Sequence, residues 1–367
     1  MRYKLLGRSG LRVSELALGT MTFGEDWGFG ASKEESKKIF NAFVEAGGNF
    51  IDTAVNYTNG TSEKYVGEFI REKHEQFVVA TKYTLNTRPH DPNGGGNHRK
   101  NLVQSVEKSL KQLQTDYIDL LWLHAWDFMT PVEEVMRALD DLVRSGKILY
   151  VGVSDTPAWI VSQANMLSTL RGWTPFIGLQ IEYNLLQRTP ERDLLPMARA
   201  LDIGVTAWAP MAGGALTGKY NYPSAEKGRL SPQSARLNER NRAISAIVEE
   251  IAKELAVSPA QVAINWVRQQ AGTVIPLIGA KREEQMKDNL GSMAFRLSET
   301  HLTQLNEASK IELGFPHDFL ASESVLNAIH GKTFGKIEKN NIESLGEGEK
   351  SMKGKICLIT GGNSGDW

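Results

Sequence analysis

Short apolar runs alternate with longer stretches of helical period between Glu15 and about Leu290. This alternation is typical of repeated β-α units around a parallel sheet. Eight of the runs have the length of buried strands, and we predict them at Leu16–Leu18, Phe50–Asp52, Phe77–Thr81, Ile118–His124, Ile148–Ser154, Leu179–Glu182, Val205–Ala209 and Val274–Ile278. Eight strands of this kind favour an α/β fold in which one (β/α)8 barrel, a TIM barrel, forms the core.

Capping signals mark the starts of several intervening helices. Segments 32–35, 130–133 and 258–261 each place a Ser or Thr three residues before an acid or an amide, and the last two carry proline at the second position. These patterns predict helix N-termini at Ser32, Thr130 and Ser258. A turn around residues 8–11 separates two short apolar runs, so we predict an N-terminal β-hairpin outside the repeat that plugs one end of the barrel.

Two connections, Leu85–Lys100 and Met211–Arg236, are long for simple loops. Long loops inside a compact domain are usually functional or disordered. Both follow predicted strands, and in a parallel barrel the loops after the strands build the active-site face. We therefore expect both loops on that face.

Polar side chains suited to acid-base chemistry lie at or just beyond the ends of three predicted strands. They are Asp52, Tyr57, Lys82 and His124. Each alone has a structural explanation, since an aspartate can cap a turn and a histidine can be satisfied within the core. The ends of the strands converge on one face of a barrel, so their joint placement predicts a catalytic site.

At this point the chain resembles the aldo-keto reductase superfamily. The resemblance covers about residues 1–312, and its segments occur in the family's order at 19–24, 47–67, 78–83, 116–124, 151–155, 180–188, 207–220 and 275–289. The DW after GTMTFGE and the long 85–100 loop are most similar to microbial members related to aryl-alcohol dehydrogenases and to potassium-channel β subunits. The resemblance implies an NADP(H)-dependent oxidoreductase that interconverts carbonyls and alcohols, with NAD(H) as the alternative cofactor.

The family's Asp-Tyr-Lys-His tetrad falls on the four residues already singled out. Carbonyl reduction needs a proton donor at oxygen, and a free tyrosine with a pKa near ~10 is a weak one. The Lys82 cation is expected to lower the pKa of Tyr57, while Asp52 holds the lysine charged. A neutral His124 would align the carbonyl. Tyr57 is thus the expected proton donor in reduction and the base in oxidation.

The resemblance also assigns a cofactor site. Trp208 would stack on the nicotinamide, and Ser154, Asp155 and Gln180 would bind its carboxamide, Asp155 standing where asparagine is more usual. The pyrophosphate would lie along the glycine-rich segment with Gly213, Gly214 and Lys219. The adenosine half would meet the helix start that holds Gly279, Lys281, Arg282, Gln285 and Asn289. Two cations there favour a 2′-phosphate, and hence NADPH over NADH.

Trp27, Trp126, Phe128 and the 85–100 loop are expected to wall the substrate pocket, which suggests a bulky or aromatic carbonyl or alcohol. Two other functions fit a barrel of this kind. A phosphate isomerase could use Gly213, Gly214 and Gly279 for a substrate phosphate, and a channel-associated regulatory subunit could bind cofactor with little turnover. Retention of the whole tetrad argues against the second.

Composition narrows the remaining classes. A net charge of −1 with 23% charged and 41% hydrophobic residues argues against nucleic-acid binding, so we expect a small-molecule substrate as partner. The single cysteine, Cys357, permits no intrachain disulfide, and no HExxH or CxxC arrangement predicts a metal site. No signal-like segment opens the chain and no apolar run approaches the ~20 residues of a membrane span, so we expect a cytoplasmic protein.

The resemblance fades after about Leu313, so we divide the chain into a barrel at 1–312 and an extension at 313–367. The extension ends in MKGKICLITGGNSGDW, which resembles the opening strand and glycine turn of a short-chain dehydrogenase, with Thr360, Gly361, Gly362 and Gly365 in place. The helix and strands that such a site requires are missing, so we expect no nucleotide binding there. The polar segment at 339–350 is linker-like, and we interpret the extension as a partly disordered or fusion remnant.

Overall fold

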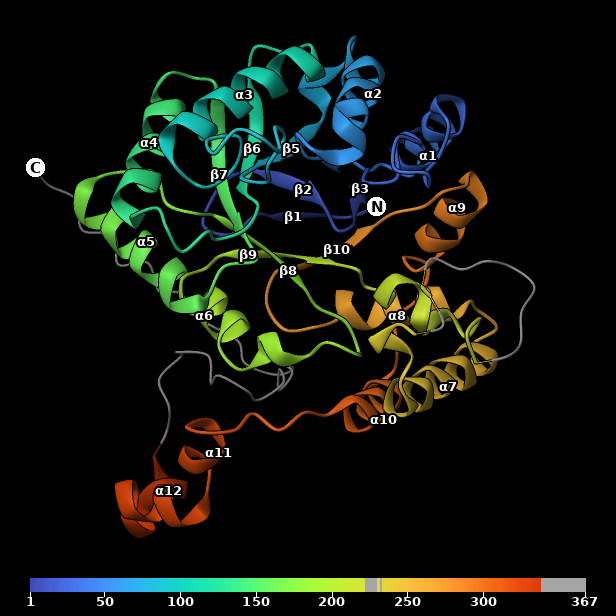
Figure 1. Ribbon diagram of the computed structural model, residues 1–367. Coiled ribbons are helices and arrows are strands. Elements are labelled where there is room, and N and C mark those ends of the chain that lie inside the picture. The colour runs from blue at the N-terminus through green and yellow to red at the C-terminus, as the bar shows by residue number, and fades with distance from the viewer. Residues whose placement is uncertain (222–229, 232, 338–367) are drawn as a thin grey trace, which may run out of the picture. The chain divides into compact units, whose positions relative to one another are not determined.

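The computed structural model describes residues 1–221, 230–231 and 233–337. Eight parallel strands close into a barrel in the order β10-β3-β4-β5-β6-β7-β8-β9, with helices around it (Figure 1). The strands are β3 (Ala17–Gly19), β4 (Phe50–Asp52), β5 (Val78–Tyr83), β6 (Ile118–Leu123), β7 (Ile148–Ser154), β8 (Gly178–Glu182), β9 (Gly204–Trp208) and β10 (Val274–Ile278). The predicted (β/α)8 fold is confirmed, with strand ends that differ from the predicted ones by at most two residues.

The barrel interior is a packed core. All six residues of β5 are buried, as expected for a strand covered on both faces. The fully buried Trp122 of β6 fills the interior beside two glycines of neighbouring strands. A Cβ at Gly152 would lie 2.4 Å from the Trp122 ring and one at Gly178 would lie 2.8 Å from it, so these glycines make room for the indole.

Ten helices cover the barrel within the described residues up to Ser309. They are α1 (Lys33–Glu45), α2 (Thr61–Ile70), α3 (Arg99–Leu113), α4 (Val132–Arg144), α5 (Ala158–Arg171), α6 (Leu194–Ala200), α7 (Glu239–Glu254), α8 (Pro259–Arg268), α9 (Glu283–Gly291) and α10 (Glu299–Ser309). Their apolar faces pack on the outer side chains of the strands and complete the main hydrophobic core.

Two of the three predicted helix caps are confirmed. The side chains of Ser32 and Ser258 accept backbone N–H groups three residues on, at 3.3 and 3.2 Å. The prediction at Thr130 is wrong, because α4 begins at Val132 with Pro131 as its N-cap residue. The Thr130 hydroxyl instead donates to Asp127 Oδ2 at 2.8 Å, a contact that the helix-capping pattern did not predict.

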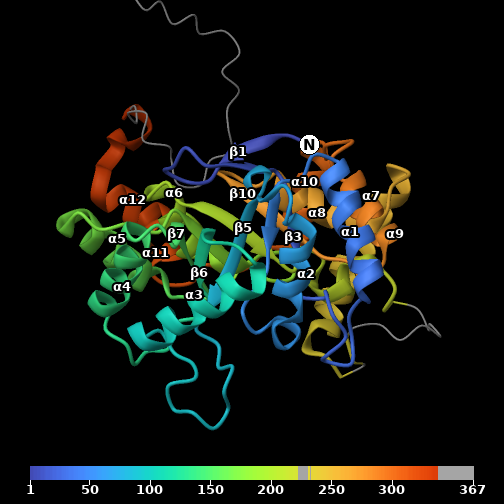
Figure 2. The same ribbon diagram turned by 90° about the horizontal axis from the view of Figure 1, so that it is seen from above.

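The predicted N-terminal hairpin is present as β1 (Tyr3–Leu5) paired antiparallel with β2 (Arg12–Ser14). Leu6, which follows β1, is fully buried among the interior strands. Gly7 has a φ of +54°, and a Cβ there would lie 2.2 Å from the carbonyl oxygen of Ile177. The hairpin closes the barrel at the end opposite to the 85–98 loop, drawn in cyan in Figure 2.

The chain divides into two compact units, Met1–Phe319 and Leu320–Trp367. The short helix α11 (His317–Leu320) spans the boundary between them, and the second unit contains α12 (Glu323–His330) and a 3-10 helix at Gly331–Lys336. The predicted linker at 339–350 and the dehydrogenase-like residues Thr360, Gly361, Gly362 and Gly365 lie outside the described residues, as does Cys357. In the described part of the chain, no helix is both long and apolar enough to cross a membrane.

Candidate active site

The four acid-base residues meet at the carboxyl end of the barrel. Asp52 is the last residue of β4, Lys82 lies one residue before the end of β5, and His124 follows β6 directly. Tyr57 begins the short 3-10 helix η1 (Tyr57–Gly60) after β4. Because β4, β5 and β6 are parallel neighbours, residues separated by more than seventy positions lie at one rim.

Asp52 and Lys82 form a buried ion pair. Lys82 Nζ donates to the Asp52 carboxylate and, at 2.7 Å, to the carbonyl oxygen of Thr53, and neither side chain is accessible to solvent. Gln180 Nε2 donates to Asp52 Oδ1 at 2.9 Å. Burial disfavours the ammonium, but Asp52 and Tyr57 outweigh burial and raise the pKa of Lys82. These contacts favour the charged form of the lysine.

The Tyr57 ring lies over this ion pair. Its centre is 4.6 Å from Lys82 Nζ and 5.9 Å from the centre of the His124 ring. Burial raises the pKa of Tyr57, and Lys82 lowers it by less than burial raises it. Lys82 thus acts in the expected direction, but the pKa of Tyr57 rises overall, because the phenolate loses more hydration than one ammonium restores.

His124 is neutral over the physiological range. Burial, and then the Lys82 cation, lower the pKa of His124 to about 3. Its Nδ1 is buried and has no hydrogen-bond partner among the described residues. The ring can therefore act as a neutral hydrogen-bonding group next to Tyr57 but not as a cation.

The backbone around Tyr57 adopts a tight left-handed turn. Thr58 and Asn59 have φ values of 46° and 56°, and Gly60 follows at 95°. The Thr58 hydroxyl donates to the Phe23 carbonyl oxygen at 2.7 Å and accepts the Ser62 N–H at 3.0 Å. These contacts hold the turn against the loop after β3 and fix where Tyr57 enters the site.

The residues assigned to the nicotinamide lie on β7, β8 and β9 or directly after them. Ser154 ends β7, and Asp155 follows it with a φ of 40°. Asp155 Oδ1 accepts the indole N–H of Trp208, the last residue of β9, at 3.2 Å. Gln180 is turned to Asp52, so it links the predicted carboxamide site to the tetrad.

The glycine-rich segment forms a concave turn, the 3-10 helix η4 (Ala212–Thr217). Gly213 and Gly214 have φ values of 69° and 94°, where other residues are strained. Lys219 Nζ lies 3.1 Å from the position that a Cβ of Gly214 would occupy. The segment thus combines a left-handed backbone turn with a lysine beside it, a combination suited to phosphate.

The predicted cation pair, Lys281 and Arg282, precedes α9. Lys281 Nζ lies 5.3 Å from the centre of the Phe29 ring, and the exposed Arg282 is the N-cap residue of the helix. The other two residues hold the helix start together. Gln285 Oε1 accepts the Lys281 N–H at 2.9 Å, and Asn289 Nδ2 donates to the Gly279 carbonyl oxygen at 3.3 Å.

These residues fit a phosphorylated dinucleotide. Gly213 and Gly214 have positive φ values that let the backbone turn beside Lys219, and Lys281 and Arg282 provide cations at the N-terminus of α9. The rim with Trp208 and Asp155 provides an aromatic face and a hydrogen-bond acceptor. Within residues 1–221, 230–231 and 233–337, no cluster of three or more His, Cys, Asp or Glu side chains could hold a metal ion.

The three aromatic residues assigned to the substrate pocket differ in position. Trp27 lies edge-to-face on Tyr57 with ring centres 6.3 Å apart, so it borders the predicted proton donor. Trp126 is partly buried and packs on the main core, while Phe128 is 70% exposed and has a φ of 57°. Of the three, only Trp27 is in ring contact with a tetrad residue.

The 85–100 loop is joined to the loop after β6. The Asn97 N–H donates to Asp127 Oδ2, and the Asp127 N–H donates to Asn97 Oδ1, both at 2.7 Å. Arg88 and Asp91 of the same loop line a groove of about 590 Å³ along α3, and no tetrad residue lines this groove. The loop therefore builds the rim at one end and covers α3 at the other.

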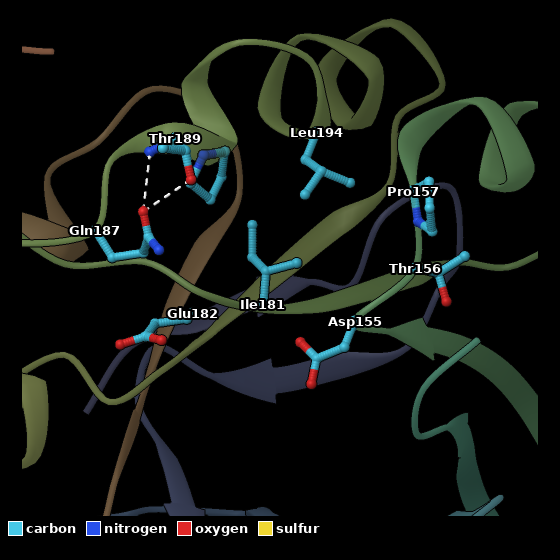
Figure 3. A pocket seen from close by; sticks show the side chains of 9 residues that line it. Asp155, Thr156, Pro157, Ile181, Glu182, Gln187, Thr189 and Leu194 are labelled. Atoms are coloured by element: carbon cyan, nitrogen blue, oxygen red, sulfur yellow. Dashed lines mark hydrogen bonds between the residues drawn. The ribbon is translucent and has the colours of Figure 1, made fainter. Parts of the chain in front are cut away.

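The rim carries a further carboxylate that is not among the predicted site residues. Glu182, the last residue of β8, binds Arg236 at 2.6 Å, and with Asp155 it borders a pocket of about 240 Å³ (Figure 3). Its place at a strand end is the signal that would have found it. Its pairing with Arg236, which lies before α7, could not be read from local sequence.

Comparison with known proteins gives one consistent result. The model of the Aldo/keto reductase family matches residues 15–310. The chain is 39% identical to norsolorinic acid reductase of Aspergillus flavus, over 86% of this chain and 83% of the relative. It is 39% identical to a putative aryl-alcohol dehydrogenase of Saccharomyces cerevisiae (88% and 90% covered) and 37% identical to aryl-alcohol dehydrogenase [NADP(+)] of Phanerodontia chrysosporium (90% and 91%).

Proposed function

Because the chain belongs to the aldo/keto reductase family, whose chemistry is the interconversion of carbonyls and alcohols, we propose that it is an NADP(H)-dependent reductase or dehydrogenase with Tyr57 as the proton donor. The observation that carries this proposal is the arrangement at the rim. A buried ammonium held by Asp52 lies 4.6 Å from the centre of the Tyr57 ring, and the ring of a neutral His124 lies edge-to-face with it at 5.9 Å.

Each side chain has a role that follows from its environment. The bound cofactor supplies the hydride. Tyr57 donates its phenolic proton to the carbonyl oxygen in reduction and accepts the alcohol proton in oxidation. Lys82 stabilises the phenolate that remains after donation, and Asp52 with the Thr53 carbonyl oxygen fixes the ammonium in place. His124 hydrogen-bonds the substrate oxygen and orients it toward Tyr57.

NADP(H) is the proposed cofactor. Lys281 and Arg282 precede α9, where two cations and the helix N-terminus favour a 2′-phosphate. The Phanerodontia chrysosporium relative carries NADP(+) in its name, which supports the same choice. Ser154, Asp155, Gln180 and Trp208 would hold the nicotinamide, and Gly213, Gly214 and Lys219 would hold the pyrophosphate.

The proposed substrates are aromatic or similarly bulky aldehydes and ketones, or the matching alcohols. Trp27 forms an apolar edge beside Tyr57, which favours a flat apolar group next to the reacting carbon. Relatives named aryl-alcohol dehydrogenase support this substrate class.

The test is a panel of aliphatic and aromatic aldehydes, ketones and alcohols, assayed with NADPH, NADH and their oxidised forms by nicotinamide absorbance. We expect turnover, with aromatic substrates and NADP(H) preferred. Tight NADPH binding without turnover of any substrate would contradict the proposal and favour the regulatory-subunit alternative.

A further inference from the structure

Two carboxylates lie at adjacent strand ends on the rim, and only one of them has a cationic partner. In Figure 3 the carboxylates of Asp155 and Glu182 lie on one side of β8, while Ile181 points to the other side, toward Leu194. Glu182 is paired with Arg236 at 2.6 Å. Asp155 forms no ion pair with any residue that the structure describes, and its carboxylate accepts the neutral indole N–H of Trp208.

The negative charge of Asp155 acts on the reacting groups. It adds to the rise in the pKa of Tyr57, and Lys82 acts on Asp155 in turn. Burial and the neighbouring Glu182 raise the pKa of Asp155 itself, which indicates a carboxylate whose charge is poorly compensated. Asp155 therefore interacts electrostatically with Tyr57 and Lys82, although it follows another strand.

Neither the backbone nor the indole contact requires a charged residue here. The φ of 40° at Asp155 lies in the left-handed region, which asparagine tolerates as well as aspartate does. An asparagine Oδ1 could accept the Trp208 N–H equally well. The negative charge is therefore the property that distinguishes aspartate from asparagine at this position.

We propose that Asp155 selects the redox state of the cofactor. Its unpaired carboxylate attracts the positively charged, oxidised nicotinamide and not the neutral, reduced one. The site therefore prefers the oxidised form more strongly than it would with an amide at this position. This inference rests on the proposed function, since it requires a nicotinamide cofactor at the Trp208 rim. Only the oxidised ring carries a positive charge, so the carboxylate distinguishes the two forms. For charges several ångströms apart near a surface, the expected discrimination is roughly threefold to thirtyfold.

Tighter binding lowers the concentration of oxidised cofactor that saturates the site in alcohol oxidation, and it makes the oxidised cofactor a strong product inhibitor of carbonyl reduction. With an amide at position 155, the oxidised cofactor would inhibit carbonyl reduction less. Asp155 thus sets how strongly each form of the cofactor occupies the site without taking part in proton transfer.

The test is Asp155→Asn, which keeps the acceptor for Trp208 and removes only the charge. Dissociation constants for NADP+ and NADPH are measured by calorimetry near pH 8. We expect NADP+ to bind roughly threefold to thirtyfold more weakly relative to NADPH than in the wild type. Asp116→Asn is the matched control, because Asp116 is exposed in the turn before β6, at the other end of the barrel. It makes the same change in net charge and should leave the ratio unchanged.

Asp155→Ala separates charge from position. It removes both the charge and the acceptor for the indole, so it should weaken NADPH as well, whereas Asp155→Asn should not. An unchanged NADP+ to NADPH ratio in Asp155→Asn, or the same change in Asp116→Asn, would overturn the inference. Failure of the wild type to bind either nucleotide would overturn the proposed function instead, so the two failures are distinguishable.

Discussion

A lysine ammonium with no access to solvent must be stabilised by its neighbours, and at Lys82 those neighbours are the reacting groups. Asp52 and the Thr53 carbonyl oxygen take its hydrogen bonds, and the Tyr57 ring lies 4.6 Å away. Burial raises the pKa of Tyr57 more than Lys82 lowers it, so the phenol keeps its proton until it is transferred. The residue chemistry thus favours Tyr57 as an acid in the resting site.

Replacing Tyr57 tests this assignment. Tyr57→Phe keeps the ring against Trp27 and removes only the hydroxyl, so the free energy of unfolding and NADPH affinity should hardly change. Carbonyl reduction should fall at least ~100-fold, the usual effect of losing a general acid. Lys82→Met should also be slow, because the developing phenolate loses its cation. Tyr65→Phe, on the outer helix α2, is the control. Near-normal kcat for Tyr57→Phe with a good aldehyde would make His124 the next candidate.

The pH dependence offers a second test at the same scale. The pKa of His124 is lowered to about 3, so no histidine titration should appear in the rate between about pH 5 and 8. Reduction needs the Tyr57 phenol, whose pKa is raised, so kcat/KM should be flat there. Oxidation needs the phenolate, so its rate should rise with pH, up to about tenfold per unit. Rate profiles in both directions give the answer, and a reduction limb with a midpoint near ~6.5 would point to histidine as the acid.

At the scale of elements, helix α2 joins the Tyr57 turn to the strand of Lys82. Glu63 of α2 is fully buried and accepts the Thr81 hydroxyl of β5 at 2.5 Å and Gln112 Nε2 of α3 at 2.8 Å. Thr81 precedes Lys82, and Gln112 also donates to the Gly60 carbonyl oxygen at 3.2 Å. The carboxyl group therefore connects the elements that position two tetrad residues.

This buried acid predicts a loss of stability with rising pH. Burial raises the pKa of Glu63 to about 7, from 4.5 for an ordinary glutamate. A raised folded-state pKa stabilises the protein below the unfolded value and loses that contribution as pH rises through the folded one. In the wild type, the free energy of unfolding should fall by about 3 kcal/mol between about pH 4.5 and 8 because of Glu63, and Glu63→Gln should remove this fall. Urea unfolding at several pH values measures it, with the exposed Glu68→Gln on α2 as control. Parallel profiles for wild type and Glu63→Gln would refute this.

The start of helix α9 predicts cofactor choice. Changing Lys281 and Arg282 together to alanine should weaken NADPH much more than NADH, since each charge-assisted phosphate contact is worth roughly 1.5 to 3 kcal/mol. Lys287→Ala on the same helix removes an exposed lysine that pairs with Glu283, and it should affect neither cofactor. Equal losses for NADPH and NADH in the double variant would show that these cations do not read the 2′-phosphate.

At the scale of the whole molecule, the barrel is complete before the end of the chain. The family match ends at residue 310, and Arg192 still holds the Glu312 carbonyl oxygen at 2.9 Å. Deleting residues 340–367 should therefore leave kcat/KM for an aldehyde and the Tm of the barrel unchanged. Thermal unfolding and the reductase assay check this, and a collapse of either would show that the extension contributes to the working enzyme.

The sequence by itself determined the barrel and the identity of the tetrad candidates. Strand and helix periods are local properties, so the positions of eight strands and two helix caps could be read from hydrophobic spacing and capping residues. Asp52, Lys82 and His124 could be found because the carboxyl ends of parallel strands converge whatever the details of packing. The same rule would have found Glu182.

Only the tertiary structure decided the electrostatic balance and the long-range contacts. Whether Lys82 or burial dominates the pKa of Tyr57 depends on how much solvent the folded chain excludes from the site. The spacing of residues along the sequence does not contain that information. The pairing of Glu182 with Arg236 and the contact of Asp155 with Trp208 join separate β-α units. Such contacts arise from through-space packing, which is why the unpaired charge of Asp155 became visible only in the folded chain.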